Sequence, residues 1–304
     1  MPALVYSPSY GADIGAHVFP VQKYGMVRDQ LLASGSFEPE AFLLPRSYGT
    51  EVLQLVHRKD YLDDLLNLRQ TQETMRSELP LDQPILNWFL TAVDGTITAT
   101  AEALGCGAAF HIGGGFHHAY PGHAEGFCYL NDVGVASAFA LKAGWVEKVS
   151  VVDLDVHQGN GTARMFQGED RVFTFSMHQQ NNYPMPKEKG DLDVGLRDRM
   201  GDEEYLQQLD EGLAKSIYDQ KPNLVQYVAG ADPYHADQLG GLSLSFDGLR
   251  ARDRMVYEAA KQVGAVVVAT TAGGYAVRAE DTAKIHTNAV LEMLEVWPQE
   301  DGLK

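Results

Sequence analysis

The chain has 304 residues and a formal net charge of −17, because 41 Asp and Glu residues outnumber 24 Lys and Arg residues. Its composition is 45% hydrophobic and 21% charged, which is typical of a folded globular protein and excludes an intrinsically disordered chain. The negative charge repels a phosphate backbone, and no Lys/Arg cluster offsets it locally, so we expect no nucleic-acid partner. Cationic substrates or partners fit this charge better.

The N-terminal segment and the cysteine content limit the class of protein further. Residues 1–10 lack a basic region followed by an apolar one, and no run reaches the roughly 18 apolar residues of a membrane span. We therefore expect a cytoplasmic protein without a membrane span, of open oligomeric state. Cys106 and Cys128 are too few for a disulfide framework or a thiolate zinc site, so any metal must be held by His and carboxylate side chains.

Short apolar or β-branched runs alternate along the chain with longer segments whose apolar residues recur every three or four positions. The runs predict strands at Ala3–Tyr6, Ala108–Ile112, Val149–Leu154, Arg171–Ser176, Leu224–Val228 and Ala265–Thr270. The longer segments predict helices at Asp60–Leu68, Ile85–Leu104, Asp132–Leu141, Glu203–Ile217, Asp247–Val263 and Thr282–Leu294. This alternation is typical of an α/β fold with a parallel sheet covered on both faces.

No internal repeat or low-complexity linker divides the chain, so we predict one domain over residues 1–304. The polar stretch Asn181–Gly201 is expected to be one long loop. The runs Val149–Leu154 and Ala265–Thr270 are continuously apolar, as strands buried on both faces are, so we place both in the centre of the sheet.

Most residues with reactive side chains follow directly after the predicted strands. Ligands of open α/β sheets bind beyond the carboxyl ends of the strands, where such residues meet. The segments concerned are Gly113–His118, Asp153–His157, Ser176–His178, Gly230–Asp232 and Gly273–Tyr275. We therefore expect one functional site at this edge of the sheet.

Asp155 and His157 have the spacing of a ligand pair. They are two positions apart, so on an extended strand end both side chains would point to the same side, and Asp232 can approach from the neighbouring strand. Two carboxylates and one imidazole leave a coordination position open for water or a carbonyl oxygen. This donor set is typical of a hydrolytic zinc site rather than a closed structural one, and Fe²⁺ would also fit.

His117 and His118 follow a glycine run, and two adjacent imidazoles are best explained by proton transfer. Asp153 and Asn160 are the natural partners to orient them. Tyr275 on its own is typical of a core tyrosine, but beside a metal its hydroxyl becomes an oxyanion donor. Other histidines before or within predicted elements are expected to be packing residues: His17, His57 and His111.

Five motifs, in their order along the chain, resemble those of the zinc-dependent histone deacetylase family. The motifs are GGGFHHAYPGHAEGFCYLND (113–132), VDLDVHQGNG (152–161), GAD (230–232), LGGLSLS (239–245) and GGY (273–275). The resemblance spans Val5 to about Glu295, nearly the whole chain. The LGGLS segment and the short chain look most like class IV deacetylases and their bacterial relatives.

This resemblance implies a three-layer arginase-deacetylase fold whose central parallel sheet has about eight strands, two more than the six predicted above. The implied zinc ligands are Asp155, His157 and Asp232. The residues implied to be catalytic are His117, His118, Asp153, Asn160 and Tyr275.

Further residues are implied to bind the substrate or a second cation. The Gly126 carbonyl would accept the substrate amide hydrogen, and Leu239 would lie at the rim of the acyl-lysine channel. Phe127 and Tyr183 would form its walls. A monovalent cation, K⁺, is implied on backbone carbonyls of Asp153, Asp155, His157, Ser176 and Met177.

The implied reaction is hydrolysis of the amide bond of Nε-acyl-lysine in a protein or peptide by metal-activated water. His118 takes the water proton, Tyr275 stabilises the oxyanion, and a protonated histidine delivers a proton to the lysine amine. The class I pattern has an aspartate where this chain has Asn160. Because a neutral amide raises imidazole basicity less than a carboxylate does, we expect a neutral His118 and a charged His117, with the final proton donor left open. Class IV resemblance also implies a preference for long-chain acyl groups.

Three alternatives share the fold. An acylpolyamine amidohydrolase would suit the charge, but polyamine-selective relatives have an acidic residue at the rim position where this chain has Leu239. An inactive acyl-lysine-binding module is disfavoured because every metal and catalytic position is retained. A two-metal ureohydrolase needs further carboxylates around the metal, and Asp237 alone does not supply them.

Overall fold

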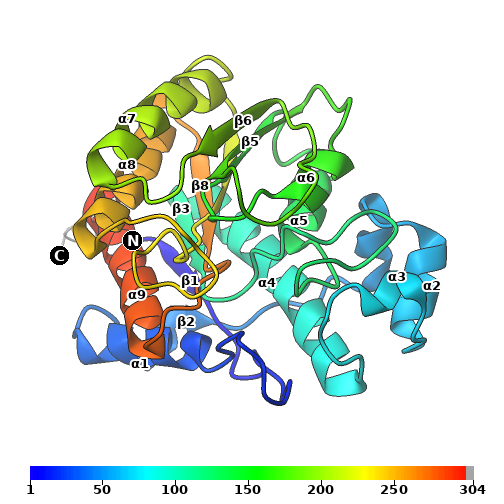
Figure 1. The fold of residues 1–304 in the computed structure, drawn as a ribbon. Helices are drawn as coiled ribbons and strands as arrows, with labels where there is room; N and C mark the ends of the chain where they lie inside the picture. The colour runs from blue at the N-terminus through cyan, green and yellow to red at the C-terminus, as the bar shows by residue number, and fades with distance from the viewer. Residues whose placement is uncertain (299–304) are drawn as a thin grey trace.

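The computed structural model describes residues 1–298, which form one sheet of eight parallel strands (Figure 1). The strands are β1 (Ala3–Val5), β2 (Phe42–Leu43), β3 (Ala108–His111), β4 (Val149–Asp153), β5 (Val172–Gln179), β6 (Leu192–Leu196), β7 (Leu224–Val228) and β8 (Val266–Thr270). Their order across the sheet is β2-β1-β3-β8-β7-β4-β5-β6. The count of eight confirms the number expected from the resemblance.

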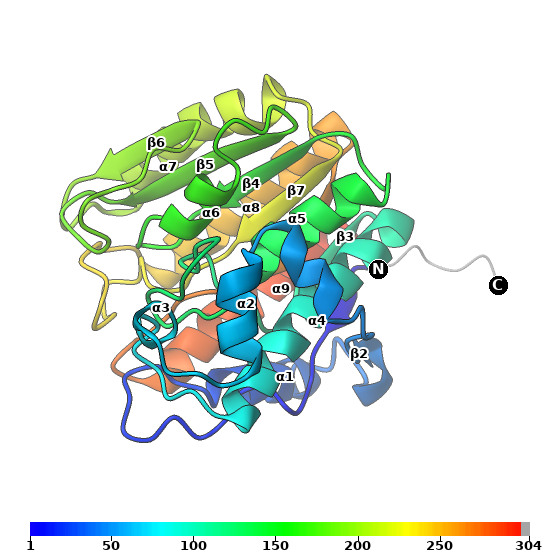
Figure 2. The same cartoon turned by 90° about the vertical axis from the view of Figure 1, so that its right-hand side faces the viewer.

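Helices cover both faces of the sheet. They are α1 (Lys23–Ala33), α2 (Lys59–Leu66), α3 (Gln72–Met75), α4 (Gln83–Cys106), α5 (Asp132–Lys142), α6 (Asn160–Met165), α7 (Asp202–Leu213), α8 (Phe246–Val263) and α9 (Ala279–Val296). Helices α1, α7, α8 and α9 pack together on one face, and α4 packs with α5 on the other. Helices α2 and α3 lie outside these layers, on the side of α4 and α5 (Figure 2). The result is a three-layer α/β fold.

Successive residues of the central strands face opposite layers, as the alternation of strand side chains requires. Val152 of β4 and Val267 of β8 belong to the core cluster that includes α8 and α9. Val151 and Val268 belong to the cluster that includes Ala99 of α4. Both strands lie inside the sheet, so the prediction of their central position is confirmed.

Side-chain caps start the helices close to the site. The Asn131 amide oxygen accepts a hydrogen bond from the Gly134 N–H at 2.8 Å and begins α5. Its amide nitrogen donates to the His117 carbonyl at 3.2 Å. Ser245 begins α8 in the same way, with its Oγ accepting from the Gly248 N–H at 3.0 Å. The cap of α5 therefore also holds the backbone of the histidine pair.

The predicted strands and helices are all present with small shifts at their ends, and α7 continues into a π-helical turn at Ala214–Tyr218. The prediction that Asn181–Gly201 is one loop is wrong, because β6 lies within it. Its residues alternate between partly buried apolar and exposed positions and pair with β5 at the sheet edge. The short alternation was masked by the polar residues around it.

Among the strands and α-helices of the described residues, four more were missed. Strand β2 has 2 residues, α3 has 4 and α6 has 6, too few to show a period. Helix α1 has a buried face that includes Lys23 and Tyr24 beside Val27 and Leu31, so its hydrophobic pattern is weak. Within residues 1–298, none of the helices combines the length and hydropathy required to cross a bilayer.

Candidate active site

Strand β4 ends at Asp153, and the chain then turns instead of continuing as an extended strand. The Asp153 carboxylate accepts a hydrogen bond from the Asp155 N–H at 3.2 Å, and the Asp155 carboxylate accepts one from the His157 N–H at 3.0 Å. These side-chain turns, and not strand alternation, bring Asp155 and His157 together, which corrects our expectation of an extended strand end. Asp232 arrives from the end of β7, the neighbour of β4, as expected.

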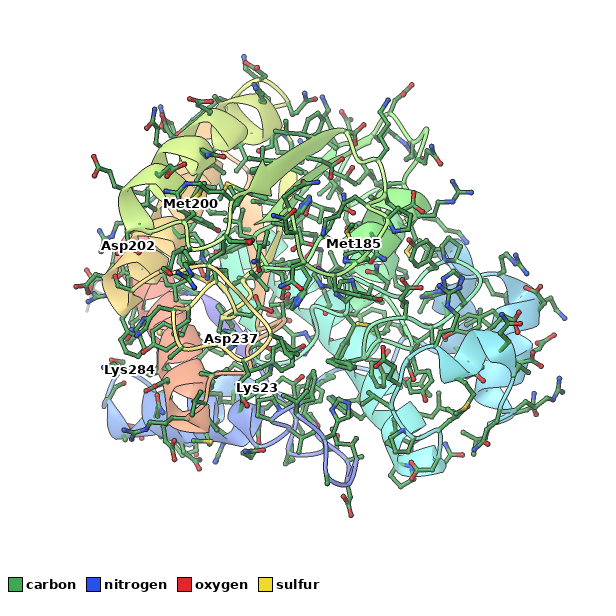
Figure 3. The ribbon with its side chains drawn as sticks, in the orientation of Figure 1. Lys23, Met185, Met200, Asp202, Asp237 and Lys284 are labelled. Atoms are coloured by element: carbon green, nitrogen blue, oxygen red, sulfur yellow. The ribbon has the colours of Figure 1, made fainter. Side chains whose placement is uncertain are left out.

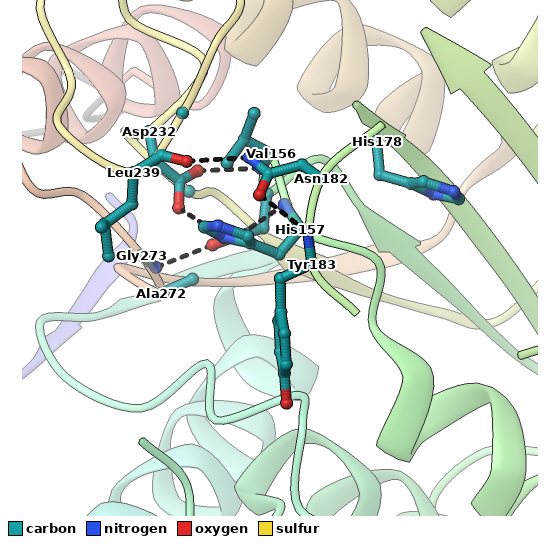
Figure 4. Close-up of polar contacts among 12 residues, drawn as sticks. Val156, His157, His178, Asn182, Tyr183, Asp232, Leu239, Ala272 and Gly273 are labelled. Atoms are coloured by element: carbon teal, nitrogen blue, oxygen red, sulfur yellow. Dashed lines mark hydrogen bonds and ion pairs between the residues drawn. The ribbon is translucent and has the colours of Figure 1, made fainter. Parts of the chain in front are cut away.

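Asp155, His157 and Asp232 converge on one buried point. Figure 4 shows His157 and Asp232 there. One ligand atom from each residue lies within 4.8 Å of the others. His157 Nδ1 is 3.1 Å from Asp155 Oδ1 and 3.3 Å from Asp232 Oδ2. Asp232 Oδ1 accepts a hydrogen bond from the Val156 N–H at 2.8 Å, whereas Oδ2 has no hydrogen-bond donor among the described residues. A buried carboxylate oxygen left free beside a second carboxylate and an imidazole nitrogen fits a divalent cation.

Two glycines leave the space that this cluster needs. A Cβ atom at Gly230 would lie 2.6 Å from Asp155 Oδ2, and one at Gly273 would collide with oxygens of both Asp155 and Asp232. The Gly273 N–H donates to Asp155 Oδ2 at 2.9 Å. The GAD and GGY motifs therefore require glycine because backbone approaches the carboxylates more closely than a side chain permits.

The electrostatics of the cluster also favour a cation. Burial, together with the charge of Asp155, raises the pKa of Asp232 to about 7. Burial acts to lower the pKa of His157, but the two carboxylates outweigh it and raise that pKa to about 10. Positive charge is therefore stabilised at this point of the sheet edge.

His117 and His118 lie beside the cluster, in the turn after β3. His117 Nδ1 is 2.6 Å from Asp153 Oδ2, and its Nε2 is 3.1 Å from His118 Nε2. His118 Nδ1 is 2.7 Å from Asn160 Oδ1. The structure thus brings each histidine to the partner expected for it.

Burial and neighbouring charges give the two imidazoles different pKa values. At His117 burial lowers the pKa, but the charges of Asp153 and Asp155 outweigh it and raise the pKa to about 9. At His118 burial, followed by the charges of His117 and His157, holds the pKa well below its usual value. His118 is therefore the neutral imidazole and His117 the protonated one, in agreement with the expectation from Asn160.

Tyr275 lines the same cavity as His118 and is 7% exposed. Burial raises its pKa well above the usual value, so its hydroxyl keeps its proton and can donate it in a hydrogen bond. Lys23, at the start of α1, lies behind the tyrosine: its Nζ donates to the Ala272 carbonyl at 2.5 Å and is 5.9 Å from the Tyr275 ring. Burial lowers the pKa of Lys23 to about 8. Figure 3 shows Lys23 and Asp237 in the same part of the molecule.

Asp237 supports the loop that carries the channel rim. Its carboxylate accepts hydrogen bonds from the N–H groups of Leu239 and Gly240, both at 2.8 Å, and of Tyr275 at 2.7 Å. All these donors are backbone groups, so Asp237 fixes Tyr275 relative to the rim loop.

An open cavity of about 230 Å³ contains the reactive groups. It is lined by Glu78, His118, Gly126, Phe127, His157, Asn182, Tyr183, Leu239 and Tyr275. The expected substrate-binding residues are all among them. Sequence reasoning missed Glu78 and Asn182, which come from loops without periodicity. A signal for Asn182 was its place beside Tyr183; its amide donates to the Leu239 carbonyl at 2.8 Å.

The residues expected to hold K⁺ lie on β5, at the end of the adjoining strand β4, or in the turn directly after β4. The register of β4 and β5 places Asp153 opposite Ser176, and Met177 follows. Ser176 Oγ is 2.9 Å from His178 Nδ1. The backbone segments named for the monovalent cation are therefore neighbours, and the cation itself stays a prediction.

Fold and site together define a three-layer α/β protein with a buried centre that suits a divalent metal. The family model of the histone deacetylase domain matches residues 17–293. Histone deacetylase 2 of Arabidopsis thaliana is 32% identical over 287 residues, which cover 90% of this chain and 74% of that protein. An uncharacterized protein of Picosynechococcus sp. is 38% identical over 286 residues, 93% of this chain and 95% of that protein.

Solved structures agree on the fold. A histone deacetylase homologue from Aquifex aeolicus superposes with a TM-score of 0.82 at 24% identity, over 98% of this chain and 84% of that one. An acetylpolyamine aminohydrolase from Burkholderia pseudomallei does so with a TM-score of 0.82 at 18% identity, over 97% and 99%. The chain belongs to the histone deacetylase family, and we class it as an amidohydrolase of that family.

Proposed function

We propose that this chain, as a single catalytic domain, hydrolyses the amide bond of Nε-acyl-lysine in a protein or peptide. The observation that carries the proposal is the lining of the cavity. Phe127, Tyr183 and Leu239 line it together with His157 and Tyr275. Aromatic and aliphatic walls suit the methylene stem of a lysine, and the polar groups suit its acyl carbonyl.

Asp155, His157 and Asp232 would hold Zn²⁺, with Fe²⁺ as the other candidate, because two carboxylate oxygens and one imidazole nitrogen leave an open position. When bound, the ion supplies Lewis-acid activation of water and of the substrate carbonyl. K⁺ would bind the carbonyls of Asp153, Asp155, His157, Ser176 and Met177.

Side chains and a backbone carbonyl of the protein would transfer the protons, stabilise the oxyanion and bind the substrate amide. Neutral His118 accepts the proton of the attacking water, and the hydroxyl of Tyr275 donates a hydrogen bond to the oxyanion. His117 stays protonated beside Asp153, which makes it a candidate donor to the departing amine. The Gly126 carbonyl accepts the hydrogen of the substrate amide.

The charge and the rim support a lysine substrate. A net charge of −17 favours the approach of lysine-rich segments. The LGGLS segment supports a place beside class IV deacetylases, and with it a long-chain acyl group. An acylpolyamine amidohydrolase is the second candidate, supported by the same charge; apolar Leu239 in the cavity lining argues against it.

The test is turnover by metal-loaded protein on lysine peptides that carry acetyl through myristoyl groups, with acetylspermidine alongside. We expect cleavage of an acyl-lysine peptide and none of acetylspermidine. Leu239→Glu should raise turnover of acetylspermidine, with Leu239→Gln as the uncharged control. Cleavage of acetylspermidine alone by the wild type would establish the polyamine candidate, and metal binding without any turnover would favour an acyl-lysine-binding module.

A further inference from the structure

His118 is the general base of the proposed reaction, and its partner is Asn160. The side chain of Asn160 does not by itself determine which imidazole nitrogen of His118 carries the proton. His118 can accept a proton on Nε2 only if its own proton is on Nδ1, which faces Asn160. An aspartate in that place would accept a hydrogen bond only, so it would require the Nδ1–H form. An asparagine has an oxygen and an NH₂ group, and a flip of its amide would instead stabilise the Nε2–H form, which is useless as a base.

Glu125 removes this ambiguity. Its Oε1 lies 3.1 Å from Asn160 Nδ2. An ionised carboxylate accepts hydrogen bonds and donates none, so the NH₂ group of Asn160 must face Glu125 and the oxygen must face His118. The imidazole nitrogen 2.7 Å from that oxygen must then be the N–H. Nε2 is left with its lone pair and faces His117 Nε2 at 3.1 Å, so the N–H of a protonated His117 favours the same tautomer.

Glu125 is held in the ionised, acceptor-only form by its surroundings. Its side chain is 13% exposed, and burial alone would raise its pKa. A hydrogen bond from His123 to Oε2, at 3.1 Å, and the charge of Arg76 outweigh burial, and the pKa lies below its usual value. Arg76 Nη2 also binds Oε2. The Tyr183 hydroxyl is a further hydrogen-bond partner of this carboxylate, and Oε1 accepts from Asn160 Nδ2.

The other neighbour of the amide favours the same orientation. The Tyr120 hydroxyl donates its one proton to Glu188 at 3.2 Å and lies within hydrogen-bond reach of Asn160. It can therefore only accept from the NH₂ group of Asn160, so it assists Glu125 and does not oppose it.

We propose that Glu125 is a positioning residue that orients the amide of Asn160 and thereby holds His118 in the Nδ1–H tautomer that can act as a base. Glu125 is neither one of the residues that line the cavity nor one of the proposed metal ligands. The inference rests on the proposed function for its catalytic consequence, but the tautomer itself can be measured without substrate.

Glu125→Gln is the sharpest substitution. Arg76 is a donor only, so the single amide oxygen of the new side chain goes to Arg76, and its NH₂ group turns toward Asn160. Asn160 must then present its oxygen to residue 125 and its NH₂ group to His118. The substitution should therefore shift His118 toward the Nε2–H tautomer, against the hydrogen bond that a protonated His117 donates to His118 Nε2.

The tautomer is read from ¹⁵N chemical shifts of histidine-labelled protein, in the metal-free and the zinc-loaded form, with His118 assigned from the spectrum of His118→Gln. We expect the Nδ1–H form in the wild type and a measurable population of the Nε2–H form in Glu125→Gln. Arg76→Met is the control, because it removes the ion pair and leaves the carboxylate facing Asn160; it should keep the Nδ1–H form. An unchanged Nδ1–H signal in Glu125→Gln would overturn the proposal.

Kinetics supply the second readout. Glu125→Gln should lower kcat on the order of tenfold, less than the 10²–10⁴ that complete loss of a general base costs, with KM unchanged. Asn160→Asp alone should also be impaired, because it places a carboxylate 3.1 Å from Glu125. The double variant Asn160→Asp/Glu125→Gln should recover kcat, since the aspartate requires the correct tautomer unaided and the glutamine donates to it.

These outcomes separate the inference from the proposed function. If no acyl-lysine is cleaved but the ¹⁵N shifts change as described, the proposed function fails and the role of Glu125 stands. If acyl-lysine is cleaved and the double variant is no better than Asn160→Asp, the role of Glu125 fails. Thermal unfolding of each variant controls for loss of fold.

Discussion

Tyr275 is enclosed by aromatic rings, including Phe19 at 5.9 Å and Phe127 at 6.1 Å between centroids. Burial raises its pKa well above the usual value, so the hydroxyl is a stable donor in the reaction we propose. Tyr275→Phe should keep the fold and the metal but lose about 3–4 kcal/mol of transition-state stabilisation, as loss of an oxyanion donor does. The measurement is kcat with metal content determined in the same sample. Tyr257→Phe, a buried tyrosine of α8 outside the cavity, is the matched control, and a wild-type rate in Tyr275→Phe would contradict the role.

Asp232 differs from its neighbours because one of its buried oxygens has no donor among the described residues. Asp232→Asn retains an acceptor for the Val156 N–H but removes the charge that a cation needs. We expect loss of bound metal, measured by calorimetric titration of metal-free protein with Zn²⁺. Asp247→Asn, an exposed change of equal charge on α8, should bind metal normally. A full metal complement in Asp232→Asn would remove this residue from the ligand set.

Helix α8 supports the ends of two strands through one buried guanidinium. Arg252 Nη1 donates to the Gly230 carbonyl at 2.6 Å, and its Nε donates to Asp253 Oδ1 at 2.9 Å. Tyr227 also donates to Asp253 Oδ1, at 2.5 Å. Because Gly230 is two residues before Asp232, the helix fixes the backbone that carries a proposed ligand.

Replacing one partner of this ion pair should therefore be costly. Arg252→Met leaves Asp253 buried and unpaired, and we expect the free energy of unfolding to fall by about 3–5 kcal/mol. The double variant Arg252→Met/Asp253→Leu should recover most of that stability, because an apolar pair replaces the ion pair. Its affinity for Zn²⁺ should still be reduced, since the Gly230 carbonyl has lost its donor. Urea unfolding and calorimetric titration measure the two effects separately; wild-type metal affinity in the double variant would rule out the support role.

Over the whole molecule, buried neutral histidines make stability depend on pH. His57 and His111 are packing residues, as expected: Nδ1 of His57 is 2.9 Å from the Tyr120 carbonyl, and Nε2 of His111 is 2.6 Å from the Tyr10 hydroxyl. Burial lowers the pKa of His57 to about 4 and that of His111 to about 3. In the unfolded chain both return to about 6.5.

The direction of the pH dependence of stability follows from these pKa values. The unfolded state binds protons below pH 6.5 and the folded state does not, so the stability contribution is complete above pH 6.5 and is lost as pH falls toward 4. At pH 5 each histidine should cost about 2 kcal/mol, from 1.5 pH units at 1.36 kcal/mol each. His57→Gln should show about 2 kcal/mol less loss between pH 7 and pH 5 in urea unfolding. The same pH dependence as the wild type would contradict it. The comparison of variants matters because burial raises the pKa of Asp94 to about 6, which acts in the opposite direction.

Most of the architecture could be predicted from local pattern. Interior strands such as β4 and β8 are continuously apolar, and long amphipathic helices such as α8 have a clear period, so both kinds of element were found. The strands and α-helices that were missed are β2, β6, α1, α3 and α6. Strand β2 and helices α3 and α6 are too short to show a period, β6 lies in polar sequence, and α1 buries a lysine.

The sequence by itself determined which chemical groups the site contains and that they gather at one edge of a parallel sheet, because those residues sit in short motifs directly after strands. Only the tertiary structure decided that turns, and not a strand, bring Asp155 and His157 together, that Lys23 lies beneath Tyr275, and that Glu125 faces Asn160. These contacts join segments distant in the chain or depend on side-chain hydrogen bonds. Proton positions and pKa values follow from such distances and from burial, neither of which is a property of a motif.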